Sequence, residues 1–207
     1  MPAAPNAWVN TVPNNIQNTD GSTGRWYNEM TAWWYTRMVN ESLNMREKMV
    51  LFFHNHFANE RDKVNYPQNM YAQNQLFRKY AFGNFKQLVK DVSKDPAMLI
   101  YLDGNNSRGV NPNENYAREL QELFTVGKGP NSKFTESDVS EMARLLTGWY
   151  FDWDKSQKKE GRTEVLNSYW NHDTGVKQFS AFYGNRKISG SNDPDRADGE
   201  LREAIDM

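Results

Sequence analysis

The sequence predicts a mainly α-helical protein with about seven helices and a small β-hairpin or irregular insert near residues 164–184. Apolar residues recur at the spacing of helices that bury one face. Proline and short polar residues stand where such stretches begin, and glycines stand where they end. The 207 residues suffice to bury a core. We expect an irregular segment over residues 1–24 and one helical domain over residues 25–207.

The first two predicted helices are rich in aromatic residues. The helix over residues 24–40 carries a stripe on one face, formed by Trp26, Met30, Trp33, Trp34 and Met38. This stripe is typical of a core-facing helix, with an aromatic ligand-binding platform as the alternative. For the second helix, which ends near His56, we expect one buried face formed by Met45, Met49, Phe52, Phe53 and His56. At roughly 100° per residue, His54 falls on the opposite side, nearer solvent.

Capping signals mark several of the remaining helices. Asp95-Pro96 is an N-cap followed by proline at the first helical position. Asn113 can cap another helix, and Thr135 with Asp138 resembles a capping box. The predicted helices cover residues 66–85, 85–92, 95–102, 114–125 and 135–148, with a last one from about residue 199. No stop signal follows in this last helix, so we expect a domain truncated at its C-terminus.

Composition argues against several classes of function. The net charge is -1, with 25 basic and 26 acidic residues, which gives no electrostatic footprint for nucleic acid. No run of about 18 apolar residues exists, so we expect no membrane insertion. The first residues lack the basic and apolar regions of a signal peptide. Cysteine is absent, which removes disulfides, thiolate metal sites and a cysteine nucleophile.

The chain has three histidines, and their positions suggest chemistry. His54 and His56 are two residues apart, and His172 stands in a predicted turn over residues 172–175. Imidazole is the commonest metal ligand and titrates near neutrality. Glu119 falls at the edge of a predicted apolar helix face, where an unpaired charge would be costly to bury.

Three readings of these residues stay open. His56, Glu119 and His172 could bind Zn²⁺ or iron, with His54 or Asp173 in addition. The spacings match no established metal signature. Glu119 or Asp173 could instead act as an acid or base with His56, without a metal. The third reading is a structural network of hydrogen-bonded polar side chains.

The start of the helix over residues 114–125 also allows two readings. Its N-terminus could line a pocket, with Asn115, Tyr116 and Arg118 as the pocket residues. Alternatively, Asn113 simply caps the helix, and Arg118 pairs with Glu122 one turn later.

Three long stretches resemble a large bacterial family, the domain of unknown function eighteen-hundred (DUF1800): residues 45–57, 111–125 and 135–149. Residues 172–175 followed by Lys177 are similar to a fourth motif of that family, and the resemblance covers residues 25–190. It implies a helical bacterial protein, and it suggests export to the periplasm or cell surface. The family has no settled activity. The alternative to a metal or acid–base site is therefore a non-catalytic scaffold or binding protein with partners in the cell envelope.

Overall fold

The computed structural model describes residues 4–11, 22–41, 45–152, 165–168, 170–191 and 193–207. Residues 12–21 of the predicted irregular segment lie outside these ranges. The described residues form nine α-helices and four short strands, which confirms the mainly α-helical fold. The chain divides into two compact units, described separately below. The first comprises Met1–Tyr101 and Phe151–Glu164, and the second comprises Leu102–Tyr150 and Val165–Met207. The single domain over residues 25–207 stays a prediction.

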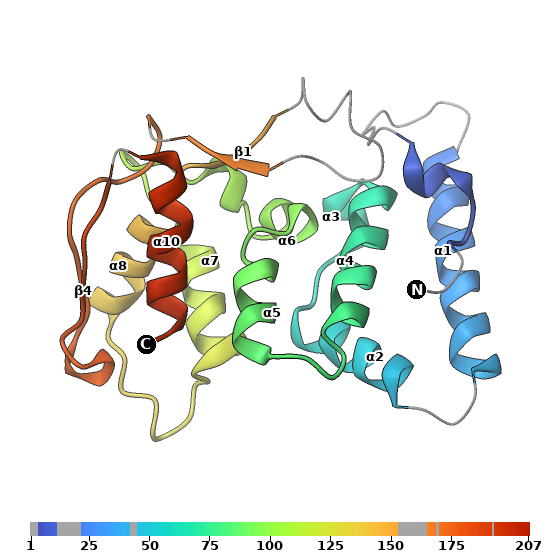
Figure 1. Cartoon of the computed structure of the whole chain (residues 1–207), viewed down its shortest axis with the longest axis horizontal. Helices are drawn as coiled ribbons and strands as arrows, with labels where there is room; N and C mark the ends of the chain where they lie inside the picture. Colours follow the sequence, from blue (N-terminus) through green and yellow to red (C-terminus); the bar gives the residue numbers. More distant parts are fainter. Residues whose placement is uncertain (1–3, 12–21, 42–44, 153–164, 169, 192) are drawn as a thin grey trace. The chain divides into compact units, whose positions relative to one another are not determined.

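The first unit is organised around one helix that carries buried amides. This helix, α4 (Pro67–Lys79), contacts a short 3₁₀ turn and five helices: η1 (Ala7–Asn10), α1 (Ser22–Asn40), α2 (Arg46–His56), α3 (Arg61–Val64), α5 (Phe85–Val92) and α6 (Pro96–Tyr101). Figure 1 shows α4 running beside α3 and α2. Its fully buried amides are Gln68, Asn69, Gln73 and Asn74. Because buried amides need hydrogen-bond partners, this face constrains the packing of its neighbours more tightly than an apolar face would.

The predicted buried face of α2 is wrong in part. Glu47, Val50 and Phe53 are buried, whereas Met45 is 59% exposed and Phe52 is 52% exposed. The sequence offers two neighbouring apolar stripes on this helix. The packed stripe contains Glu47 because Arg78 of α4 donates two hydrogen bonds to its carboxylate, at 2.8 and 2.6 Å. A paired carboxylate can be buried, and the hydrophobic pattern alone gives no sign of that pairing.

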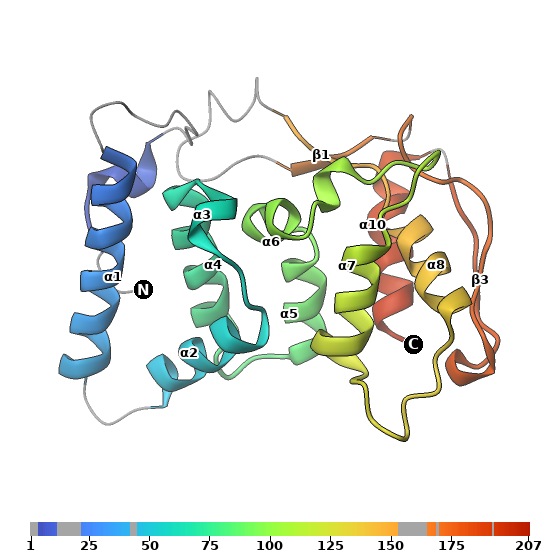
Figure 2. The ribbon, with the colours of Figure 1, turned by 180° about the vertical axis from the view of Figure 1, so that it is seen from behind.

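The second unit packs its helices around α8 (Glu136–Leu145), which contacts α7 (Glu114–Glu119), α10 (Pro194–Ile205) and β3 (Lys177–Gln178). Figure 2 shows α7, α8 and α10 close together. In the predicted insert, β2 (Val165–Asn167) pairs with β1 (Trp149–Phe151), and β3 pairs antiparallel with β4 (Lys187–Ile188). The strands of the insert therefore pair with strands outside residues 164–184. Two 3₁₀ turns complete the unit, η2 (Gly104–Asn106) and η4 (Ala181–Tyr183).

Three predicted helix starts are confirmed by their caps. The Asp95 carboxylate accepts a hydrogen bond from the Met98 backbone N–H at 3.1 Å. Asn113 accepts one from the Asn115 N–H at 2.9 Å. Thr135 and Asp138 form a complete capping box at the start of α8. Each of these side chains satisfies backbone donors that the first turn of a helix leaves free.

Two helix predictions need correction. The helix predicted over residues 114–125 is α-helical only to Glu119 and continues as a π-helical turn, η3 (Leu120–Thr125). A π turn holds one extra residue, which rotates later side chains, and Leu123 is 59% exposed. The last helix begins at Pro194, five residues before the predicted start. Among the described helices, none is both long and apolar enough to cross a membrane.

Candidate functional site in the second unit

His172 lies at the centre of a buried polar cluster in the second unit. Its Nδ1 lies 2.9 Å from the carbonyl oxygen of Thr147, and its Nε2 lies 3.3 Å from Glu200 Oε2. The His172 residue is 6% exposed. The Thr147 carbonyl can only accept a hydrogen bond, so Nδ1 donates to it, and Nε2 faces the Glu200 carboxylate. Both ring nitrogens are therefore occupied by contacts within the protein.

Glu200 also binds a buried lysine. The Lys177 ammonium lies 2.8 Å from Glu200 Oε2, and both side chains are fully buried. Lys177 donates a second hydrogen bond to the backbone carbonyl of Asp173. Burial by itself raises the pKa of the Glu200 carboxyl, but the hydrogen bonds from His172 and Lys177 bring that pKa below its ordinary value. Glu200 of α10 is therefore an anion at neutral pH, and it binds both His172 and Lys177.

The Asp173 carboxylate is bound on both oxygens. Arg144 of α8 donates to it through Nε and Nη2, each at 2.9 Å, in the fork geometry that suits a guanidinium. Arg144 also donates to Glu141 at 2.6 Å. Burial opposes ionisation of Asp173, but Arg144 and the N–H of Gly175 lower the pKa of its carboxyl. The carboxylate is therefore a fixed structural anion.

Gly148 allows the chain to pass directly beside the histidine. Its φ is +89°, a conformation that favours glycine. A Cβ at this position would lie 2.9 Å from the Ser168 carbonyl oxygen and 3.0 Å from His172 Cβ. The Gly148 N–H donates to the Ser107 carbonyl at 3.0 Å, and its own carbonyl accepts from the Ser168 N–H at 2.8 Å. These two hydrogen bonds join the backbone at Gly148 to the segments that carry Ser107 and Ser168.

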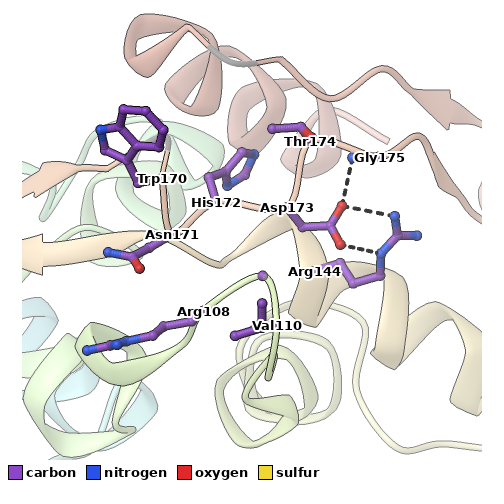
Figure 3. A pocket seen from close by; sticks show the side chains of 10 residues that line it. Arg108, Val110, Arg144, Trp170, Asn171, His172, Asp173, Thr174 and Gly175 are labelled. Atoms are coloured by element: carbon purple, nitrogen blue, oxygen red, sulfur yellow. Dashed lines mark hydrogen bonds and ion pairs between the residues drawn. The ribbon is translucent and has the colours of Figure 1, made fainter.

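An open pocket of about 400 Å³ lies over the turn. Its lining residues are Arg108, Gly109, Val110, Arg144, Trp170, Asn171, His172, Asp173, Thr174 and Gly175. Figure 3 shows the Arg144–Asp173 pair on one side of the pocket, with Trp170 and Arg108 on the other. Trp170 is 81% exposed and Val110 is 94% exposed. Pockets of this volume fall within the range that binds small molecules.

The predicted pocket residues on α7 lie elsewhere. Asn115 is exposed, Tyr116 is buried in the core, and Glu119 is partly buried. Arg118 makes ion pairs with Glu136 at 2.6 Å and with Glu122 at 3.5 Å. None of these residues lines the pocket over the turn. Arg118 thus makes the ion pair of the alternative reading, and a pocket at the start of α7 stays a prediction.

His54 and His56 belong to the first unit and lie on different sides of α2. His56 stacks on Phe52, with ring centroids 5.9 Å apart, and approaches Phe85 at 5.8 Å. His54 packs against Trp34 of α1, with ring centroids 4.6 Å apart, and its Nε2 is hydrogen-bonded to Asn74 of α4. His54 was expected to lie nearer solvent than His56, but both residues are partly buried, because α1 and α4 cover the side of α2 that carries His54.

Hydrogen bonding fixes the protonation state of His54. Arg78 Nη1 donates to Asn74 Oδ1 at 2.6 Å, so the Asn74 amide nitrogen faces the ring. That nitrogen lies 3.1 Å from His54 Nε2 and can only donate, so Nε2 must be an unprotonated acceptor. Burial and the neighbouring Arg78 charge lower the pKa of His54 to about 3. His54 is therefore a neutral structural histidine.

This state predicts a pH-dependent stability. Because the pKa of His54 is lower in the folded than in the unfolded chain, acid favours the unfolded chain from about pH 6.5 downward. The stabilisation is fully present above that pH, and we expect a loss of about 2–3 kcal/mol by roughly pH 4.5. Urea titrations of the wild type and His54→Gln at both pH values measure it. His54→Gln should lose most of this slope, and an unchanged slope would contradict the assignment.

The proposed metal ligands are divided between the units. His54 and His56 lie in the first unit, whereas Glu119, His172 and Asp173 lie in the second. Over the residues that the structure describes, no group of three or more His, Asp or Glu side chains could hold a metal ion. The joint Zn²⁺ or iron site stays a prediction without geometric support in either unit.

Sequence reasoning missed the most buried members of the cluster. Lys177 was named from the sequence only as part of a family motif. Alternate residues of a strand share a face, so the apolar Phe179 could have indicated that Lys177 is buried too. Glu200 precedes Leu201 and lies four residues before Ala204, so it shares the buried side of α10. Trp170 and Arg108 gave no signal, because nothing in their local sequence brings them to one pocket.

Comparison with known proteins gives one match. The family described as "Protein of unknown function (DUF1800)" matches residues 3–207. Neither the curated proteins nor the solved structures contain a chain that matches this one.

Proposed function

Because the chain belongs to the DUF1800 family, which is described as having no known function, we propose that its second unit is a ligand-binding module. One observation carries the proposal. The side chains of His172 and Asp173 bind other side chains of the protein, whereas strongly exposed side chains border the pocket above them. In this proposal the cluster around His172 is a structural network that supports the pocket floor, and the binding contacts come from Arg108 and Trp170.

The acid–base alternative is less well supported by the same contacts. A general base needs a lone pair that can reach the substrate. Both Asp173 oxygens are bound by Arg144, and both His172 nitrogens already contact groups of the protein. A cell-envelope location accompanies the proposal only through the family resemblance.

Two kinds of variant separate a structural network from a binding surface. We expect His172→Ala to lower the free energy of unfolding by about 1–3 kcal/mol, because it leaves the partners of the ring unpaired. Trp170→Ala and Arg108→Ala should change it by less than about 0.5 kcal/mol, because both side chains are exposed. Urea titration followed by circular dichroism measures all three.

The binding role is tested by a thermal-shift screen. The probes are oligosaccharides, mononucleotides and short peptides. At least one class should raise the melting temperature of the wild type and fail to raise that of Trp170→Ala. Equal shifts in both proteins, or no shift with any class, would overturn the proposal.

A further inference from the structure

Within the proposed binding function, on which this inference rests, we propose that the pocket binds an acidic saccharide. A sugar ring lies against the exposed face of Trp170, and its carboxylate binds Arg108. The argument starts from apolar surface. Two large apolar side chains line the pocket, Trp170 and Val110, and both are strongly exposed. An indole that is 81% exposed offers a large apolar ring surface to a ligand.

The charge of the pocket indicates an anionic group. Asp173 and Glu141 both pair with Arg144, so that guanidinium is already compensated. For Arg108, the structure records no side-chain hydrogen bond or ion pair with any described residue. One uncompensated guanidinium therefore remains at the pocket. Arginine binds carboxylates through two parallel hydrogen bonds, which gives orientation as well as attraction.

The Arg108 backbone is held in place before any ligand binds. Arg108 and Asn111 form an isolated antiparallel bridge. Their backbone hydrogen bonds measure 3.4 and 2.8 Å. The next residue, Gly109, donates to the Asn171 carbonyl at 2.7 Å, which ties this loop to the turn that carries Trp170. A Cβ on Gly109 would lie 3.1–3.2 Å from backbone atoms of residues 172 and 173, so the two segments touch. A preorganised site loses little entropy on binding.

A saccharide fits these features better than the other classes. A pyranose has an apolar C–H face that can cover an indole, and its hydroxyls suit the side chains of Asn171 and Thr174 in the lining. A nucleic acid would need several cations along its backbone, whereas the pocket has one uncompensated cation and the chain has a net charge of -1. One arginine can pair with one carboxylate of an acidic saccharide at a time.

The test uses defined probes. Trigalacturonic acid is titrated into the full chain by calorimetry, with neutral galactotriose as the matched ligand. We expect trigalacturonic acid to bind at least about tenfold more tightly than galactotriose, and Arg108→Gln to remove that difference. Trp170→Ala should abolish the binding of both. Arg202→Gln is the control, because Arg202 is an exposed arginine of the same unit that does not line the pocket.

Each further outcome contradicts a defined part of the proposal. Equal binding of the two sugars, unchanged in Arg108→Gln, overturns the acidic saccharide but leaves a Trp170-dependent binding site. A second outcome leads to the same conclusion. In it, neither sugar binds, AMP or a tripeptide does bind, and Trp170→Ala abolishes that binding. Sugar binding that survives both Trp170→Ala and Arg108→Gln overturns the saccharide site and the proposed function together.

Discussion

Replacing Lys177 by methionine is expected to lower the free energy of unfolding by about 3–5 kcal/mol. The ammonium and the Glu200 carboxylate are fully buried 2.8 Å apart. Removing one charge leaves the other buried with reduced compensation, and that is costlier than losing an exposed ion pair. Urea titration followed by far-ultraviolet circular dichroism measures the change. Lys128→Met is the control, because the Lys128 side chain is 76% exposed. It should shift the free energy of unfolding by less than about 0.5 kcal/mol.

A double variant distinguishes charge burial from simple loss of packing. Lys177→Met with Glu200→Leu removes both charges and leaves apolar side chains of similar size. We expect it to recover a large part of the stability that Lys177→Met loses, so that the two effects are far from additive. Additive losses would show that the pair contributes through packing alone. His172 keeps its hydrogen bond to the Thr147 carbonyl in this variant, but its partner on the other nitrogen is lost.

Gly148→Ala is expected to cost about 2–4 kcal/mol, for two reasons that can be measured separately. A positive φ costs a residue with a Cβ about 1–2 kcal/mol, and the new Cβ meets backbone at 2.9 Å. Gly127 has a φ of +86° and open space around it, so Gly127→Ala measures the conformational cost alone. Gly129 has open space without a positive φ. Gly129→Ala should be nearly neutral. Equal effects at the three positions would contradict the close packing of Gly148 against His172.

Much of the fold could be predicted because helix signals are local. The caps at Asp95, Asn113 and Thr135 each depend on residues a few positions apart, and the structure has them where expected. The π turn after Glu119 could not be predicted in this way. Its sequence fits an uninterrupted α-helix, and the extra residue depends on packing within the unit.

The candidate site was harder to predict because its partners are distant in sequence. His172 and Asp173 were singled out from residue type alone, but their meaning depends on Arg144, 29 residues before Asp173, and Glu200, 28 residues after His172. On α2, the buried Glu47 is explained only by Arg78, 31 residues later. Residue type indicates where polar chemistry is concentrated. Whether a group is free to react depends on contacts that the local sequence does not contain.

The late position of Glu200 in the sequence also affects how the chain folds during its synthesis. The turn around His172 is made 28 residues before its carboxylate partner, and Lys177 is made 23 residues before it. At translation rates of 5–20 residues per second, Glu200 is synthesised roughly 1–6 s after His172. During this interval two side chains destined for the core have no buried anion from α10, so their segment should stay hydrated. The second unit can therefore close only after α10 is synthesised, and nascent chains halted before residue 200 should be open to proteases around residues 172–177.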